Sequence, residues 1–190
     1  MKRVVLIGDS IRMGYQDVVR RTLEKKLGGQ CVSVLTPDEN GGDSRNVLAH
    51  LDAWVFAQRP DILHINCGLH DIKRPFNSGE LAVPLADYEV NVRQILTRIL
   101  DGFEQTTNSG PHVMWATTTP VNEAWHHARK PFDRFEADVR VYNAVAVRVA
   151  GELGVPINDL FTLVMDAGRD QYLLPDGVHF TDAGYRLLGQ

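Results

Sequence analysis

Val4-Val5-Leu6-Ile7-Gly8-Asp9-Ser10, near the beginning of the chain, gives the clearest indication of the fold. Its apolar residues form a short run rich in β-branched side chains, which is typical of a strand buried on both faces of a parallel sheet. We expect this strand to cover residues 3–7. A helix is expected over 13–27, because apolar residues there recur at helical spacing and a Gly-Gly pair follows. A strand that turns directly into a helix indicates an α/β protein.

The same alternation of strand and helix continues along the chain. Strands separated by helices predict a three-layer α/β/α sandwich around a five-stranded parallel sheet, in a single domain over residues 1–190. The further strands are expected over 31–35, 61–66, 112–117 and 155–157, and the further helices over 43–56, 88–100, 132–153 and from 182 onward.

Residues that could take part in catalysis or binding follow the predicted strands at the point where each strand ends. Ser10 follows the first strand, Gly42 the second and His70 the third. Ligands of open parallel sheets bind at the carboxyl ends of the strands, where these loops meet. We therefore expect the three residues to share one site.

The segment Asp176-Gly177-Val178-His179 supplies what a serine nucleophile at this site would need. A serine hydroxyl is a poor nucleophile until a base takes its proton, and a histidine is a good base once a carboxylate fixes its tautomer. The spacing of three residues lets Asp176 and His179 come from one tight turn. In the alternative reading, Ser10 is only the N-cap of a helix and Asp176 a solvated loop acid. Together the residues predict a catalytic triad of Ser10, His179 and Asp176.

Four segments resemble, in order, the sequence blocks of the SGNH, or GDSL-type, hydrolase superfamily. This resemblance implies a flavodoxin-like strand order, 2-1-3-4-5, with Ser10 as nucleophile and Gly42 as an oxyanion-hole residue, and it implies chemistry without a metal or an organic cofactor. The four segments are Gly8-Asp9-Ser10, Asn40-Gly41-Gly42-Asp43-Ser44, Gly68-Leu69-His70-Asp71 and Asp176-Gly177-Val178-His179.

His70 departs from the pattern of this family. The third block usually carries an asparagine whose amide donates a hydrogen bond to the oxyanion, and His70 stands at that position. An imidazole N–H can make the same donation, so His70 is a candidate oxyanion donor. Alternatively, it is a loop histidine held by a backbone hydrogen bond. Asp9 and Asp71 are expected to brace loops by accepting backbone N–H groups.

These residues predict a serine esterase that hydrolyses carboxylic esters, with short acyl or acetyl esters, including those on carbohydrates, as the expected substrates. Two alternatives remain open. The same triad could transfer the acyl group to a sugar hydroxyl, as an O-acyltransferase does. The departure at His70 could instead mark a weakly active or non-catalytic relative that binds a carbohydrate or a protein.

Composition limits the partners and the location. The net charge of −4, with acidic and basic residues interspersed, argues against a nucleic-acid-binding surface. The first apolar run is too short for a membrane span or a signal peptide, so we expect a cytoplasmic protein, although a leader removed earlier would leave no trace. Cys31 and Cys67 are expected to be buried free thiols. The oligomeric state is not predicted.

Trp125, His126 and His127 are expected in a polar loop after the fourth strand. Histidines adjacent in sequence rarely bind one ion, and no cysteine or carboxylate cluster completes a metal site. Trp125 is a candidate for one wall of the substrate site.

Overall fold

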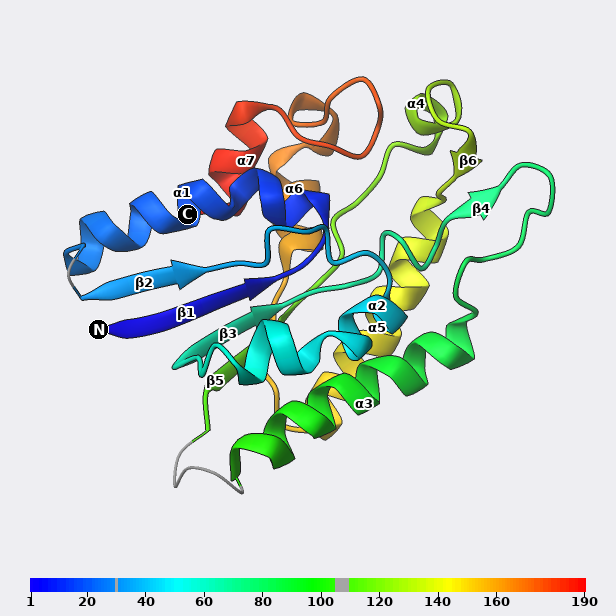
Figure 1. Ribbon diagram of the computed structural model, residues 1–190. Coiled ribbons are helices and arrows are strands. Elements are labelled where there is room, and N and C mark those ends of the chain that lie inside the picture. Colours follow the sequence, from blue (N-terminus) through cyan, green and yellow to red (C-terminus); the bar gives the residue numbers. More distant parts are fainter. Residues whose placement is uncertain (30, 105–109) are drawn as a thin grey trace.

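A five-stranded parallel sheet forms the centre of the molecule (Figure 1). The computed structural model describes residues 1–29, 31–104 and 110–190. The strand order is β2-β1-β3-β5-β7, which confirms the predicted order 2-1-3-4-5 once the strands of this sheet are counted along the chain. Neighbouring strands all pair in parallel. The strands are β1 (Lys2–Ile7), β2 (Val32–Leu35), β3 (Ile62–Ile65), β5 (His112–Ala116) and β7 (Ile157–Asn158).

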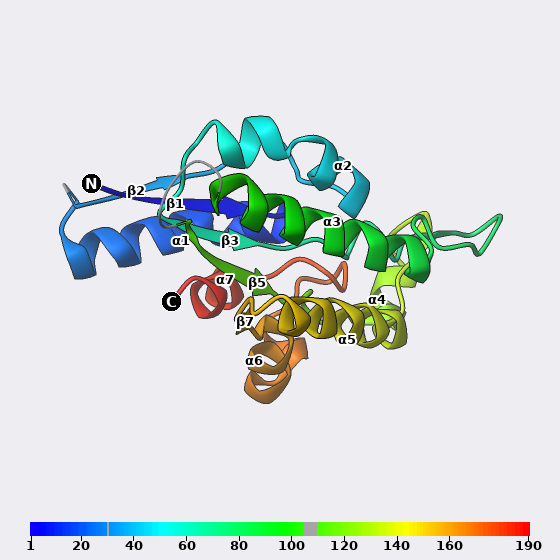
Figure 2. The same ribbon diagram turned by 90° about the horizontal axis from the view of Figure 1, so that it is seen from below.

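Helices cover both faces of this sheet, as the alternation in the sequence predicts. Helices α1 and α7 lie side by side on one face with α6 next to α7, whereas α2, α3 and α5 lie on the other (Figures 1 and 2). The bounds are α1 (Ser10–Leu27), α2 (Ser44–Ala49), α3 (Leu85–Glu104), α5 (Glu136–Glu152), α6 (Leu160–Ala167) and α7 (Asp182–Leu188).

Strand β1 contributes side chains to both layers of the core. Val5 and Ile7 are fully buried in the larger core cluster, whereas Val4 and Leu6 belong to a second cluster with Val32 and Val34 of β2. Successive side chains of a strand point to opposite faces, so a continuous apolar run is what a strand covered by helices on both sides requires.

The predicted helix over 132–153 was wrong at its beginning. Helix α5 starts only at Glu136, and Phe132–Asp133 form the short strand β6, which pairs antiparallel with β4 (Arg74–Pro75). We call this pair the β4–β6 ribbon. Two-residue strands show no periodicity that a sequence pattern could reveal, so the ribbon was not predicted.

Other boundaries also differ from the prediction. The helix expected over 43–56 is divided into α2 and a π-helical turn at Asp52–Phe56. The loop expected around Trp125 contains the short helix α4 (Glu123–His127). Helix α6 and a 3₁₀ turn at Arg169–Gln171 were not predicted.

The two cysteines are both free, but their burial differs. Cys67 is buried, as expected, whereas Cys31 is exposed, which corrects that prediction. Strand β2 begins at Val32, so Cys31 lies in the turn before the sheet, where its N–H donates to the carbonyl of Gly28.

Across the residues that the structure describes, no helix is both long and apolar enough to cross a membrane.

Candidate active site

Ser10 lies at the carboxyl end of β1, as the first residue of α1. The preceding Asp9 caps the helix, since its Oδ1 accepts the N–H of Ile11 at 2.9 Å. Asp9 is buried, and burial raises the pKa of its carboxyl group. Within the described residues no group accepts a hydrogen bond from the N–H of Ser10. This amide points out of the first helical turn and is available to a ligand.

Ser10, His179 and Asp176 form a continuous chain of hydrogen bonds. Ser10 Oγ lies 2.9 Å from His179 Nε2. On the other side of the ring, His179 Nδ1 lies 2.6 Å from Asp176 Oδ2. An Nδ1–H that donates to the carboxylate leaves Nε2 free to accept the serine proton. The structure therefore brings together the three residues that the sequence assigned to a triad.

Asp176 is held by more than the histidine ring. Its Oδ1 accepts the backbone N–H groups of Val178 at 3.1 Å and His179 at 3.0 Å. Lys130 Nζ lies 3.3 Å from Oδ2. Burial alone would raise the pKa of Asp176, but the hydrogen bonds from His179 and from these backbone amides hold it well below its usual range. Asp176 is consequently ionised at neutral pH.

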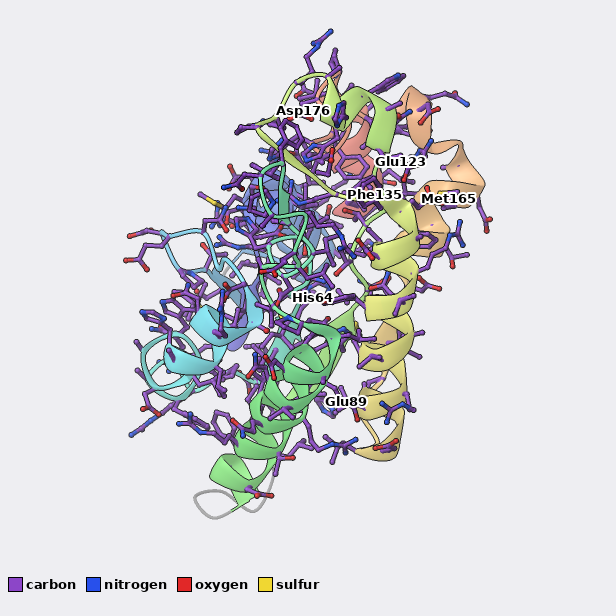
Figure 3. The ribbon with its side chains drawn as sticks, turned by 90° about the vertical axis from the view of Figure 1, so that its right-hand side faces the viewer. His64, Glu89, Glu123, Phe135, Met165 and Asp176 are labelled. Carbon is purple, nitrogen blue, oxygen red and sulfur yellow. The ribbon has the colours of Figure 1, made fainter. Side chains whose placement is uncertain are left out.

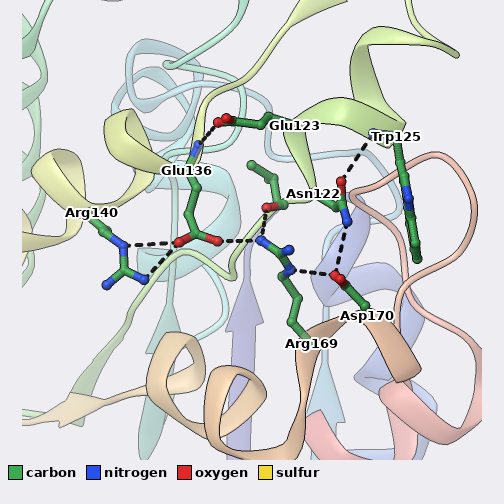
Figure 4. A network of polar contacts seen from close by, with 8 residues as sticks. Asn122, Glu123, Trp125, Glu136, Arg140, Arg169 and Asp170 are labelled. Carbon is green, nitrogen blue, oxygen red and sulfur yellow. Dashed lines mark hydrogen bonds and ion pairs between the residues drawn. The ribbon is translucent and has the colours of Figure 1, made fainter.

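Asn122 ties the loop that carries Asp176 and His179 to its surroundings. Its N–H donates to the carbonyl of Gly177 at 2.8 Å, and its side-chain amide donates to Asp170 at 3.1 Å. Its Oδ1 accepts the N–H of Trp125. Figure 4 shows that this residue belongs to a larger network in which Arg169 joins Asp170 to Glu136 of α5. Three segments distant in sequence thus fix one another next to the triad.

Figure 3 shows Asp176 at the same end of the molecule as Glu123 of α4, away from Glu89 of α3. Asp176 therefore lies near α4, at the end of the molecule that is remote from Glu89.

The loop after β2 passes directly over the Gly8-Asp9-Ser10 turn. The N–H of Gly41 donates to the carbonyl of Gly8 at 3.0 Å, and a Cβ atom at Gly41 would lie 2.6 Å from that oxygen. Only glycine permits this approach. Gly42 follows with a φ of 66°, and its N–H donates to Asn40 Oδ1 at 2.9 Å. A substrate oxygen would therefore compete with Asn40 for the N–H of Gly42.

His70 lies in the same pocket as Ser10 and His179. Burial, followed by the positive charges of Lys73 and Arg134, lowers the pKa of His70 to about 4. Its imidazole is therefore neutral at pH 7 and carries one N–H. Asn66 does not stand in for it, because its side-chain amide donates to the carbonyl of Ala116 at 2.7 Å.

Asp71 braces the next loop. Its two oxygens accept the N–H of Ser44, at 3.0 and 3.1 Å, which joins the third sequence block to the start of α2. Burial raises the pKa of Asp71 to about 7, although the hydrogen bonds from Ser44 oppose this shift. The expectation that Asp9 and Asp71 accept backbone N–H groups is confirmed.

A small pocket of about 230 Å³ opens beside Ser10. Trp125 does not line it; it is 37% exposed and borders a separate hollow with Leu173 and Pro175. The residues that line the Ser10 pocket are Ser10, Asn40, Leu69, His70, Lys73, Lys130, Phe132, Arg134, Val178 and His179.

Sequence reasoning missed four polar residues of this pocket: Asn40, Lys73, Lys130 and Arg134. Only Asn40 carried a signal, since it begins the glycine-rich segment that follows the second strand. The three cations stand in segments without periodicity or motif, around the β4–β6 ribbon.

Among residues 1–29, 31–104 and 110–190, no group of three or more His, Cys, Asp and Glu side chains is arranged to hold a metal ion.

Comparison with known protein families identifies the family of this chain. The model of the GDSL-like lipase/acylhydrolase family matches residues 6–187, nearly the whole chain. The chain therefore belongs to this family and is an ester hydrolase. Comparison with curated protein sequences gives no match.

Solved structures agree with this assignment. A lipase/acylhydrolase from Enterococcus faecalis is 25% identical, with a TM-score of 0.80 over 100% of this chain and 92% of that one. Two structures at lower identity share the fold. The acetylxylan esterase Axe2 from Geobacillus stearothermophilus is 21% identical, with a TM-score of 0.75 over 99% and 90% of the two chains. A GDSL-like lipase from Bacteroides thetaiotaomicron is 20% identical, with a TM-score of 0.70 over 99% and 84%.

Replacing Gly177 with alanine tests how strictly the loop places the triad. Gly177 has a φ of 71°, and an added Cβ would lie 2.3 Å from the carbonyl oxygen of Asn122 and 2.8 Å from the backbone nitrogen of His126. Because both neighbours are backbone atoms, the loop must move and shift His179. We expect Gly177→Ala to lower kcat/KM for an ester by about 100-fold or more, since an error near 1 Å at a catalytic group has that effect.

Gly154→Ala is the matched control. Gly154 has a similar φ of 70°, but a Cβ there meets no atom within 4 Å. It should cost about 1–2 kcal/mol of stability from the left-handed backbone alone and leave kcat/KM unchanged. Equal activity of the two variants would show that the loop does not place the triad.

Asp71→Asn should change how stability depends on pH. The carboxyl group titrates near pH 4 in the unfolded chain and near 7 in the folded one, so the folded state binds the extra proton between these values. The free energy of unfolding contributed by this group therefore falls as pH rises from about 4 to 7. The free energy of unfolding of Asp71→Asn, measured by urea denaturation relative to that of the wild type, should therefore increase by on the order of 2 kcal/mol between pH 5 and pH 8. Asp87→Asn, an exposed carboxyl on α3, is the control, and a constant difference between wild type and Asp71→Asn would contradict the assignment.

Proposed function

We propose that this member of the GDSL-like lipase/acylhydrolase family hydrolyses short-chain carboxylic esters through an acyl-enzyme on Ser10. The observation that carries the proposal is the continuous hydrogen-bonded chain from Ser10 Oγ through His179 to Asp176, with distances of 2.9 and 2.6 Å. Ser10 also faces a pocket, so a substrate carbonyl can reach it. A binding protein would have no need of this arrangement.

In the proposed mechanism, His179 Nε2 takes the proton of Ser10 as Oγ attacks the ester carbonyl. The carbonyl carbon becomes tetrahedral, and its oxygen takes the negative charge. His179 then passes the proton to the departing alcohol, which leaves the acyl group on Ser10. Water, activated in the same way by His179, attacks the acyl-enzyme and releases the acid. Asp176 keeps the ring in the correct tautomer and stabilises the imidazolium.

The N–H groups of Ser10 and Gly42 are the proposed oxyanion donors. That of Ser10 has no acceptor among the described residues and lies at a helix N-terminus, whose partial positive charge favours an oxyanion. That of Gly42 donates to Asn40 in this structure, so we propose that the oxyanion displaces this contact. His70 is the proposed third donor, through the single N–H of its neutral ring.

The size of the pocket supports a short acyl group. About 230 Å³ is less than the roughly 300–1,000 Å³ typical of sites for drug-sized ligands. An acetyl group and part of an alcohol fit such a volume, whereas a long acyl chain does not. The fold that the chain shares with an acetylxylan esterase makes acetylated carbohydrates a reasonable class to test.

Hydrolysis of p-nitrophenyl acetate, butyrate and octanoate, with Ser10→Ala as control, tests the proposal. We expect turnover that falls with acyl length, and a loss on the order of 10⁴-fold or more in kcat for Ser10→Ala. A burst of p-nitrophenol, equal to the enzyme concentration, would reveal the acyl-enzyme if its hydrolysis is the slow step. Turnover equal in wild type and Ser10→Ala would overturn the assignment of Ser10. Release that depends on an added sugar acceptor would favour an O-acyltransferase.

His70→Ala tests the third oxyanion donor. If the His70 N–H stabilises the oxyanion, the variant should lose roughly 10²–10³-fold in kcat with little change in KM, because the contact forms only in the transition state. His70→Asn restores an N–H donor of the usual family type and should recover much of this loss. An unchanged kcat in His70→Ala would remove His70 from the oxyanion hole.

A further inference from the structure

One wall of the Ser10 pocket is positively charged. Lys73, Lys130 and Arg134 line the pocket, and none of the described residues that line it is an aspartate or a glutamate. A pocket for a neutral ester would not need this charge. The question is therefore whether the protein itself neutralises the three cations.

Lys130 is the one cation of this wall with a carboxylate partner among the described residues. Its Nζ lies 3.3 Å from Asp176 Oδ2, so its charge is used within the triad. The other two cations differ from it in this respect.

Arg134 is nearly buried, with 6% of its surface exposed. Its Nε donates to the carbonyl of Leu69 at 2.5 Å, and its guanidinium lies 5.0 Å from the centre of the Phe132 ring. No carboxylate in the described part of the chain forms an ion pair with it. The terminal nitrogens of its planar fork are therefore left for a group in the pocket. Burial lowers the pKa of Arg134 to about 10, so the side chain remains charged at neutral pH.

Lys73 lies against the same aromatic ring. Its Nζ is 5.1 Å from the centre of the Phe132 ring. This ammonium group forms no hydrogen bond or ion pair with any described residue. Burial, with a contribution from the charge of Arg134, lowers the pKa of Lys73. Two cations thus share one face of the pocket beside the nucleophile.

Carboxylates attract both cations from a distance, Asp9 and Asp176 acting on Arg134 and Asp43 and Asp9 on Lys73. Within the described residues, no carboxylate is in ion-pair contact with either cation, and such partly desolvated charges are costly to the folded protein. Such an arrangement is useful when a ligand supplies the missing negative charge, and an arginine fork matches the planar oxygens of a carboxylate or the oxygens of a phosphate. We propose that the alcohol half of the substrate carries a carboxylate or phosphate group that binds Arg134 and Lys73. The charge is assigned to the alcohol half because a short acyl group such as acetyl has no charged atom, and the proposal rests in this respect on the proposed function.

The neutral state of His70 agrees with this assignment. Its imidazole adds no positive charge, so the anion is drawn to the ribbon side of the pocket, where Lys73 and Arg134 stand next to β4 and β6. The ester is then left beside Ser10.

Matched acetyl esters test the proposal. The probes are 3-acetoxybenzoate, 3-acetoxyphenyl phosphate and the neutral methyl 3-acetoxybenzoate, with acetate release measured for the wild type and for Ser10→Ala. We expect kcat/KM to be about 10-fold or more higher for at least one anionic probe than for the neutral ester, the range that a charge-assisted hydrogen bond provides. Preference for the benzoate would identify a carboxylate substrate, and preference for the phosphate a phosphorylated one. In either case the preference should decrease as salt is added.

Lys73→Gln tests the residues themselves. It removes one charge and keeps most of the side-chain length, and the ratio of kcat/KM between the preferred anionic probe and the neutral ester should fall about 10-fold. Arg129→Gln is the matched control, because Arg129 is an exposed cation that does not line the Ser10 pocket. Its ratio should stay at the wild-type value. Arg134→Lys keeps the charge but removes the fork, and it should raise KM for the anionic probe.

Two results would overturn the anion site. One is Ser10-dependent turnover of the neutral ester that equals or exceeds that of both anionic probes. The other is an equal fall, in Lys73→Gln and Arg129→Gln, of the ratio of kcat/KM between the anionic and the neutral probe. This would indicate that the overall electrostatic field of the protein attracts the anion, and not a specific site. Neither of these two results would contradict the proposed esterase function. Absence of Ser10-dependent turnover for all three probes and for p-nitrophenyl acetate would instead overturn the proposed function, and the anion site with it.

Discussion

The hydrogen bond between Ser10 Oγ and His179 Nε2 is the contact on which the site depends, and it joins residues 169 positions apart. The parallel sheet reduces the entropy cost of forming this contact, because it brings the carboxyl ends of all its strands to one edge. Ser10 is placed by the start of α1, and His179 by a turn that Asp176 closes through two backbone hydrogen bonds.

Polar contacts hold the loops around this hydrogen bond to one another. The N–H of Gly41 reaches the carbonyl of Gly8, and the N–H of Asn122 reaches that of Gly177. Arg134 fixes the carbonyl of Leu69 beside His70. Each contact satisfies a backbone group that would otherwise be costly to bury. The same contacts therefore stabilise the loops and set the geometry of the pocket.

The charged groups beside the pocket have different effects. Asp176 remains ionised because its hydrogen bonds outweigh burial, and its Oδ2 lies 2.6 Å from His179 Nδ1. Lys73 and Arg134 lie against the ring of Phe132 and help to keep His70 neutral. A neutral ring can donate one N–H without attracting an anion to itself, so in the proposed mechanism different residues position the charged group and stabilise the oxyanion.

Local patterns were enough to predict the sheet, its five strands and the segments that carry Ser10, Gly42, His70 and the Asp176–His179 turn, because apolar runs and short turns can be read from neighbouring residues. These patterns could not predict the β4–β6 ribbon, the start of α5 at Glu136 or the exposure of Cys31, since two-residue strands and turn ends leave no periodic signal. Two features of the pocket became visible only in the folded molecule: Asn40 accepts the N–H of Gly42, and Lys73, Lys130 and Arg134 line the pocket beside Ser10. These side chains come from separate loops, and their approach depends on how the loops fold over the sheet edge.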